Sequence, residues 1–506
     1  MSDLLNKASL VMIPSGYKED VVYSAIPSDG SGDLSFTRAS NGTRINSAGL
    51  VEDCPWNFMQ QSETFDNASW SKLGATVTAN DITAPNGTLT ADKVVFSGAN
   101  NSIYQAVSLN GEIATRFVYI KGTAGETISI DDIYVSQPNI TLTGDWQLIG
   151  FTSATPSLRG FGISTYGGAT ARTIWLWGAQ LNIGSTAKPY FPTTDRLNVP
   201  RLTYQNGGGG CPSLLLEKQS TNVLLWSQAF TNTWATYNGT TTDNETISPD
   251  GTQNASKVIM GAGNSATIRQ AIGGLTNGST YTFSLYIKQG SGVTAFLDIS
   301  DTASTVNITP TSEWVRYTYT ANWNTSLNFV DIELRGTSGS AYCYIYGAQL
   351  EASSYPTSYI PTTSASATRV ADVMTVNLPN TDMTFCAYLE CEEAPLGTTA
   401  GDWLAIYSDI SILGRAYGYA NTFGFADAYG MGITSATKMV WKQESGTTAK
   451  LFKNGALVAT STTGTYSDPF NRFAIDGNYL DKPLKVKQFI FFQNNLTDAE
   501  CASLTA

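Results

Sequence analysis

The sequence contains no histidine among its 506 residues. This absence excludes Ser-His-Asp and Cys-His nucleophile arrangements, histidine-ligated zinc sites and histidine-based pH switching. Charged residues are also scarce, at 14% of the chain, against roughly a quarter in an ordinary soluble protein. Most classes of enzyme are therefore excluded before any motif is considered.

Basic residues are few as well. Lys and Arg number 29 against 41 Asp and Glu, which gives a net charge of −12. Such a chain does not attract a phosphate backbone, so nucleic acid is not expected as a partner. The chain does not open with a basic segment and a long apolar run, and no stretch approaches the roughly 18 apolar residues of a membrane helix. We therefore expect synthesis in the cytoplasm, without a secretion signal or a membrane span.

Cysteine is sparse and shows no paired spacing. The six cysteines are scattered and include no Cys-x-x-Cys pair, which is typical of small buried hydrophobic residues. Oxygen-rich turns at residues 243–245 and 298–301 contain calcium-type ligands, but they lack the spacing of a calcium loop. We therefore expect no metal site and no cofactor, and calcium stays open as an alternative to ordinary turn roles.

The sequence does show the alternation of apolar and polar residues that is typical of β-strands. Residues 280–288 place apolar side chains at every second position, which predicts a half-buried strand. Asn454-Gly455 between two apolar runs predicts a type I′ hairpin, because both central residues of that turn need a positive φ. Residues 497–500 form a capping box that predicts one short terminal helix. The sequence therefore indicates an all-β fold with little helix.

The middle of the chain is an internal duplication that pairs residues 57–194 with residues 222–363. Matched positions include Trp70 with Trp234, Lys121 with Lys288, Trp146 with Trp314, and residues 177–181 with 346–350. A unit of about 140 residues with many short strands has the size of a β-sandwich. We predict that both copies have the same strand order, and that the recurring tryptophans belong to the core.

The duplication sets the domain organisation. An N-terminal segment, residues 1–56, is too short for an ordinary core of its own. The first sandwich spans residues 57–194 and the second spans residues 222–363, with a glycine-rich connector at 195–221. Residues 364–506 are long enough for a third sandwich.

Several of these segments resemble parts of bacteriophage proteins. Residues 8–57, with Phe36-Thr-Arg-Ala-Ser40 and Thr43-Arg-Ile-Asn46, look like the opening of virion fibre or tail-associated proteins. The connector's residues 200–204 and 211–217 are similar to the segment that such proteins place before a carbohydrate-binding-like module. The two copies resemble the jelly-roll modules of carbohydrate-binding families 4 and 9. The third domain resembles concanavalin A-like or laminin G-like sandwiches, through residues 451–455 and 496–500.

This resemblance implies a non-enzymatic virion structural protein, a fibre or appendage of the head or tail. It implies assembly in the host cytoplasm, a place on the virion surface, and attachment to other virion proteins through residues 1–56. It also implies a homotrimer whose sandwiches adhere to host or mucosal glycans. A bacterial surface adhesin is an alternative that the missing secretion signal disfavours.

Candidate glycan-binding residues are aromatics outside the pattern shared by the two copies, because a sugar ring packs its C–H face on an aromatic ring. They are Trp175, Trp226, Trp323, Tyr417, Tyr419 and Tyr429. The three tyrosines lie in the domain most distant from the predicted attachment segment, where recognition loops are expected. Packing between protomers is an equally good explanation for these side chains.

An enzyme alternative is a tail-associated, polysaccharide-degrading glycoside hydrolase, since that chemistry needs two carboxylates and no histidine. Glu390 and Glu392 lie two residues apart in a strand-like run, so they project from one face. The run faintly resembles the acidic strand of laminarinase-like sandwiches, but residues 393–395 end it before a further carboxylate. We favour no catalysis here, and interpret the acidic run as an edge strand protected by charge.

Overall fold

The computed structural model describes the chain except residues 1, 15–21, 23, 29–30, 108–112, 132–138, 155–159, 167–169, 195–196, 206–207, 262–264, 300–305, 325–326, 337–339, 380–381, 383, 394–403, 408–436, 446, 463–470 and 481. Two compact units make up the chain, and each is described by itself. One unit is Cys54–Asn198, and the other combines Met1–Asp53 with Val199–Ala506.

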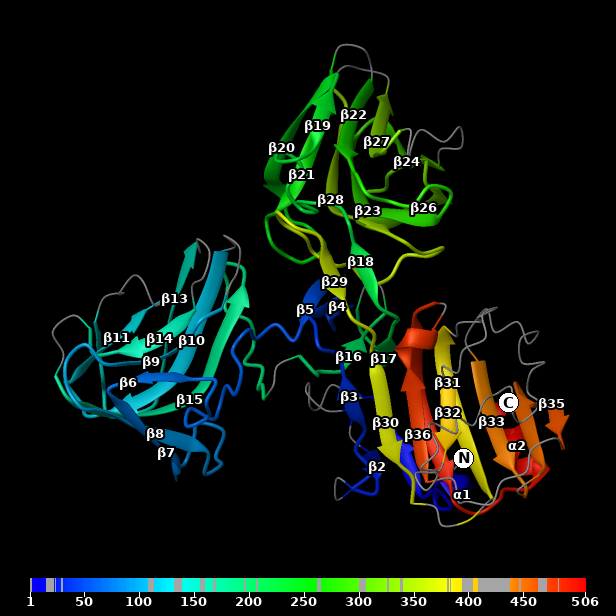
Figure 1. Cartoon of the computed structure of the whole chain (residues 1–506), viewed down its shortest axis with the longest axis horizontal. Helices are drawn as coiled ribbons and strands as arrows, with labels where there is room; N and C mark the ends of the chain where they lie inside the picture. Colours follow the sequence, from blue (N-terminus) through cyan, green and yellow to red (C-terminus); the bar gives the residue numbers. More distant parts are fainter. Residues whose placement is uncertain are drawn as a thin grey trace. The chain divides into compact units, whose positions relative to one another are not determined.

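The unit Cys54–Asn198 is a sandwich of two antiparallel sheets, here called the first sandwich (Figure 1). One sheet has the order β13-β10-β15-β8-β7, with β7 Ala75–Ile82, β8 Ala91–Phe96, β10 Ile113–Gly122, β13 Gln147–Ala154 and β15 Arg172–Ile183. The other has the order β12-β11-β14-β9-β6, with β6 Ser71–Leu73, β9 Ser102–Gln105, β11 Thr127–Asp131, β12 Ile140–Thr141 and β14 Phe161–Ser164. The core between them contains Trp70, Val94, Val118, Ile163 and Leu176, all buried.

The second sandwich repeats this topology strand for strand. Its sheets have the orders β26-β23-β28-β21-β20 and β25-β24-β27-β22-β19. The strands are β19 Ala235–Tyr237, β20 Gly239–Thr246, β21 Ala255–Met260, β22 Ser265–Ala271, β23 Thr280–Ser291, β24 Val293–Ile299, β25 Val306–Ile308, β26 Val315–Asn322, β27 Phe329–Gly336 and β28 Tyr342–Glu351. The predicted duplication is confirmed. The alternation predicted for residues 280–288 holds on its apolar side, because Tyr281, Phe283, Leu285 and Ile287 all enter the core, but Thr282 and Ser284 on the opposite side are buried as well.

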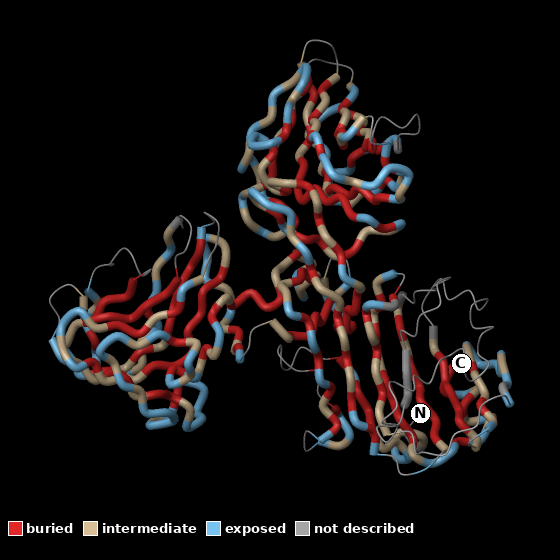
Figure 2. The backbone as a smooth tube through the Cα atoms, in the orientation of Figure 1, coloured by how far each residue is buried: buried red, intermediate tan, exposed pale blue. Residues whose placement is uncertain are grey.

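The third sandwich is assembled from distant parts of the chain. Its nine-stranded sheet contains β16 Arg201–Thr203, β17 Ser213–Leu216, β37 Leu484–Phe492, β31 Phe385–Glu393, β33 Thr437–Gln443, β34 Ala449–Lys453 and β35 Ala456–Ser461, in that order. In addition, β1 Leu10–Met12 pairs with β37, and β2 Ser24–Ile26 pairs with β1. Its four-stranded sheet has the order β3 Ser35–Thr37, β30 Val373–Asn377, β36 Arg472–Asp476 and β32 Leu404–Tyr407. Figure 2 shows that buried residues follow the strands of every sandwich.

The remaining elements are short. They are α1 Ser2–Leu5, the 3-10 turn η2 Gly477–Tyr479, α2 Asp498–Thr505, and the strand pairs β4 Gly42–Ile45 with β5 Val51–Cys54 and β18 Ser220–Asn222 with β29 Ala367–Arg369. The predicted hairpin is confirmed, with φ of 46° at Asn454 and 82° at Gly455. The predicted capping box is also present, because Thr497 and Glu500 bond reciprocally at the start of α2. In the part of the chain that the structure describes, no helix is both long and apolar enough to span a membrane.

The N-terminal segment contributes strands to both sheets of the third sandwich. Leu10 to Met12 pair with Phe491 to Phe489 of β37, and β3 pairs with β30. Leu10, Met12, Leu34 and Phe36 lie in the same core cluster as Phe489. The N-terminal segment thus contributes to the core of the third sandwich. Its role in virion attachment stays a prediction.

Candidate functional site

The outer face of one sheet of the first sandwich carries a group of aromatic side chains. In β15, Ile174 and Leu176 enter the core, so the alternation of the strand turns Trp175 and Trp177 outward. In β10, Val118 and Ile120 likewise enter the core, so Tyr119 between them points outward. We define the aromatic face as Tyr119, Trp146, Trp175, Trp177 and Tyr190.

A glycine allows these rings to gather. Trp177 lies with its ring centroid 5.4 Å from that of Tyr119 and 4.9 Å from that of Tyr190. The next residue, Gly178, has φ of 65°, at a register irregularity between β15 and β10. A Cβ atom there would lie 3.3 Å from both tyrosine rings. Gly178 therefore supplies the left-handed backbone and the space that this packing requires.

Hydrogen bonds fix most of the rings of the aromatic face. Trp175 Nε1 donates to Asp81 Oδ2 at 2.7 Å, and Trp146 Nε1 donates to the carbonyl of Thr83 at 3.2 Å. Tyr190 OH donates to Glu63 Oε1 at 3.2 Å. Trp177 is only 6% exposed, and its Nε1 has no acceptor among the described residues. The Trp177 N–H is buried, so it is not available at the surface. The face thus combines fixed aromatic rings with the carboxylates of Asp81 and Glu63, which suits a ligand with apolar and hydroxyl faces.

The second sandwich has the equivalent aromatic residues, but another part of the chain lies against most of them. The counterparts are Tyr286, Trp314, Tyr344, Tyr346 and Tyr359. Residues 42–54, here called the covering hairpin, place Ile45 and Val51 in the same apolar cluster as Tyr346 and Tyr359. Val51 N donates to the carbonyl of Pro249 at 2.9 Å, which holds the covering hairpin at this sheet.

The side chain of Tyr346, the counterpart of Trp177, also has hydrogen-bond partners within the second sandwich. Tyr346 is 1% exposed, and its hydroxyl accepts from Gln228 Nε2 and donates to Asp250 Oδ2, both at 2.9 Å. Burial, together with Asp250 and Tyr359, raises the pKa of Tyr346. The equivalent Trp177 of the first sandwich has no such partners. The aromatic face of the first sandwich is therefore the better candidate for binding.

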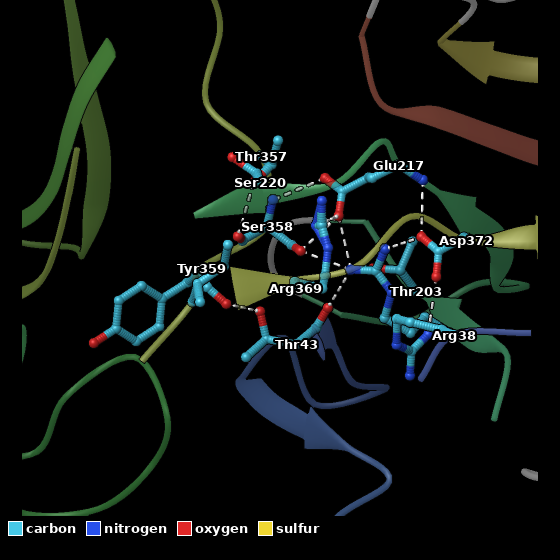
Figure 3. Close-up of polar contacts among 12 residues, drawn as sticks. Arg38, Thr43, Thr203, Glu217, Ser220, Thr357, Ser358, Tyr359, Arg369 and Asp372 are labelled. Carbon is cyan, nitrogen blue, oxygen red and sulfur yellow. Dashed lines mark hydrogen bonds and ion pairs between the residues drawn. The ribbon is translucent and has the colours of Figure 1, made fainter. Parts of the chain in front are cut away.

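A buried ionic cluster joins the covering hairpin, the connector and the start of the third sandwich (Figure 3). Arg201 contacts Glu217 Oε2 at 2.7 Å and also pairs with Asp372, and Arg369 contacts Glu217 Oε2 at 3.0 Å. Arg38 contacts Asp372 Oδ1 at 3.0 Å. All of these side chains are at most 2% exposed. The cluster is closed to solvent, so its role is structural.

The electrostatics of Glu217 follow from this arrangement. Burial raises the pKa of Glu217, but Arg369 and Arg201 outweigh burial and lower it to about 2. Ser358 contributes two further hydrogen bonds to this carboxylate, from its backbone N at 2.8 Å and from its hydroxyl at 2.6 Å. Glu217 therefore holds the tail of the second sandwich to the connector as an anion.

Glu390 and Glu392 line a cavity of about 430 Å³ in the third sandwich, together with residues 208–212 and Lys487. Tyr388 OH donates to Glu390 Oε2 at 3.0 Å, and Lys487 Nζ lies 3.2 Å from Glu392 Oε1. The prediction that both carboxylates project from one face is confirmed. Their interpretation as a protected edge strand is wrong, because β31 pairs with β33 on one side and with β37 on the other.

The other predicted site residues do not belong to the aromatic face. Trp323 is 1% exposed and packs on Tyr281 in the core of the second sandwich, so it is not a surface ligand residue. Trp226 is half-buried in a loop, where its backbone N donates to the carbonyl of Thr363 at 2.7 Å. Tyr417, Tyr419 and Tyr429 lie outside the described residues. Among the residues that the structure describes, no group of three or more Cys, Asp or Glu could hold a metal ion.

The sequence does not identify most of the aromatic face, because aromatic residues at matched positions are found both in cores and on outer faces of sheets. Trp70 and Trp234 are indeed buried core residues. Trp146 and Trp314 are half-exposed and lie on the outer faces, so a core role for this pair is wrong. Trp177 and Tyr190 belong to motifs that recur as Tyr346 and Tyr359. The usable signal was that aromatic character recurs next to Gly178 and Gly347.

No family model and no curated protein matches the chain. Among solved structures, the chain is similar to the N-terminal CBM22-1-CBM22-2 tandem domain of Paenibacillus barcinonensis Xyn10C, with 11% identity over 67% of this chain and 100% of that chain and a TM-score of 0.21. It is also similar to a CBM4 structure, with 17% identity, 26% and 92% coverage and a TM-score of 0.18. A third similar structure is the plant receptor-like kinase ANX1, with 7% identity, 62% and 96% coverage and a TM-score of 0.18. The sandwich fold itself rests on the strand orders given above.

Proposed function

We propose that this chain is a non-enzymatic, glycan-binding structural protein, and that the aromatic face of the first sandwich is its binding site. The observation that carries the proposal is a group of aromatic rings on the outer side of a sheet, with the half-exposed Trp175 and Trp146 held in place by hydrogen bonds. Aromatic rings cover the C–H faces of sugars, and fixed donors and acceptors read their hydroxyl groups. The equivalent face of the second sandwich is held against the covering hairpin.

The resemblance of residues 8–57 to virion proteins supports the wider part of the proposal. In this reading the chain is a homotrimeric head or tail fibre of a bacteriophage, displayed on the virion surface. The first sandwich then holds the particle to host or mucosal glycans. Residues 1–56 serve both the third sandwich and attachment to other virion proteins.

The experiment is binding of the full-length chain to an array of immobilised glycans. Replacing Trp175 by alanine is expected to reduce binding to the glycans that the wild type retains by about tenfold, the loss of roughly 1.4 kcal/mol of contact. Trp226→Ala is the control, because Trp226 is also half-buried but lies in the second sandwich. A Trp175→Ala protein that binds as the wild type does would contradict the proposed site.

The cavity that contains Glu390 and Glu392 favours a second candidate, a polysaccharide-degrading glycoside hydrolase. Both carboxylates have protein partners, Tyr388 and Lys487, which suits a structural role equally well. Release of reducing ends from a bound polysaccharide distinguishes the two functions. Release that is abolished in Glu390→Gln would replace the non-enzymatic proposal with the enzymatic one.

A further inference from the structure

Three neighbouring strands of the first sandwich place a tryptophan between two lysines. Lys121 of β10 is opposite Trp175 of β15, and Trp175 is opposite Lys93 of β8. Opposite residues of antiparallel strands share one side of the sheet, with Cβ atoms about 4.5–5.5 Å apart. The three side chains therefore form a row across the outer sheet face, two residues along β15 from Trp177.

The same row occurs in the second sandwich. Lys288 of β23 is opposite Tyr344 of β28, and Tyr344 is opposite Lys257 of β21. Tyr344 is half-exposed and lies outside the cluster that the covering hairpin contacts. Neighbouring outer positions have diverged, since Leu148 of the first sandwich corresponds to Arg316 in the second. The lysine-aromatic-lysine row is thus a feature that both copies retain.

Three of the four lysines in the two rows have no charged partner among the described residues, and the fourth, Lys257, has its Nζ 4.3 Å from the ring centroid of Tyr342. Lys93, Lys121 and Lys288 are half-buried, and among the described residues none of them has an ion-pair or hydrogen-bond partner. Acidic residues outnumber basic ones by 41 to 29 in this chain, so partners are not scarce. The carboxylate next to Trp175 belongs to Asp81, and it accepts the Trp175 Nε1 hydrogen bond at 2.7 Å. Two lysines thus flank Trp175 on the same side of the sheet, and the Asp81 carboxylate is the negative charge that contacts the tryptophan directly.

We propose that the lysine-aromatic-lysine row binds an anionic glycan. The ring of Trp175 or Tyr344 packs on the sugar, and the flanking ammonium groups bind carboxylate, sulfate or phosphate substituents through charge-assisted hydrogen bonds. The inference rests on the proposed function and names its ligand class. Because the row occurs in both sandwiches, each chain has two such sites, and the site of the first sandwich extends into the aromatic face.

The test is titration calorimetry of the full-length chain with three probes of equal length: oligogalacturonate, a sulfated gluco-oligosaccharide and the neutral gluco-oligosaccharide. The wild type is expected to bind an acidic probe at two sites per chain, at least about tenfold more tightly than the neutral probe, and more weakly as salt rises. Comparison of oligogalacturonate with the sulfated probe identifies which anionic group is preferred.

Two double variants assign the acidic-probe binding to the two lysine-aromatic-lysine rows. Lys93→Gln/Lys121→Gln is expected to remove the tighter acidic site, and Lys257→Gln/Lys288→Gln the other, each lowering the stoichiometry from two to one. Lys188→Gln is the control within the first sandwich, because its side chain lies outside the row. Equal affinity for acidic and neutral probes, or unchanged binding in both double variants, would overturn the inference while the glycan-binding function stands. Failure of the wild type to bind these probes or any arrayed glycan would overturn both.

Discussion

A chain lacking residues 2–37 is expected to have an unfolded third sandwich and an intact first sandwich. The deletion removes β1, β2 and β3 and with them the buried side chains of Leu10, Met12 and Phe36. Each fully buried side chain of this size contributes about 1.5–3 kcal/mol, and a whole domain is stable by only about 5–15 kcal/mol. Hydrogen exchange with mass spectrometry should show loss of protection in β31 and β37 and no change in β10 and β15.

A matched pair of point variants separates the core contribution from the deletion itself. Leu10 is fully buried, whereas Ile26 on the adjacent strand is 38% exposed. Leu10→Asn should reproduce much of the loss of protection, and Ile26→Asn should not. Full protection of β37 in the deletion variant would contradict the strand pairing.

Replacing Glu217 by glutamine is expected to destabilise the unit that contains the second and third sandwiches by about 3–5 kcal/mol at neutral pH. The variant leaves Arg201 and Arg369 buried without the charge that they share. Denaturant unfolding of the full chain measures the change, with the transition of the first sandwich as an internal reference. Glu333→Gln is the control: it removes an ion pair whose Arg335 side chain is 60% exposed, and should cost less than about 1 kcal/mol.

The effect of Glu217 has a defined pH dependence. Its pKa is about 2 in the folded protein, against an ordinary value of 4.5. A carboxyl group whose pKa is lowered by folding contributes its stabilisation above the unfolded pKa and loses it as pH falls through the folded pKa. The stability difference between the wild type and Glu217→Gln should therefore narrow as pH falls from 4.5 to 2. A difference that stays constant over this range would show that Glu217 is not ionised in the folded state.

Features encoded locally could be predicted from the sequence. The alternation at residues 280–288, the Asn454-Gly455 turn and the capping box at 497–500 each need only a few adjacent residues, and all are present. The duplication could also be predicted, because both copies share an ordered set of turns and strands. Aromatic residues at matched positions then follow from the equal strand orders of the two sandwiches.

Pairings between distant segments could not be predicted. Nothing near Leu10 indicates that its partner is Phe491, and nothing near Glu390 indicates strands on both sides of β31. The aromatic face was missed for a related reason, since a recurring tryptophan fits a core and an outer sheet face equally well. Trp146 and Trp70 recur alike, but Trp70 packs in the core between the sheets, whereas Trp146 packs in the outer-face cluster with Trp177.

The most direct test of the central claim compares Trp146→Ala with Trp314→Ala by calorimetry, using a glycan that the wild type binds on the array. The two tryptophans are matched, because both are half-exposed and each donates Nε1 to a backbone carbonyl, at 3.2 Å for Trp146 and 3.0 Å for Trp314. They differ in that Trp314 packs in the cluster that the covering hairpin contacts. We expect Trp146→Ala to lower the affinity by at least about tenfold and Trp314→Ala to leave it unchanged. Unchanged affinity in Trp146→Ala, or an equal loss in both variants, would contradict glycan binding at the aromatic face.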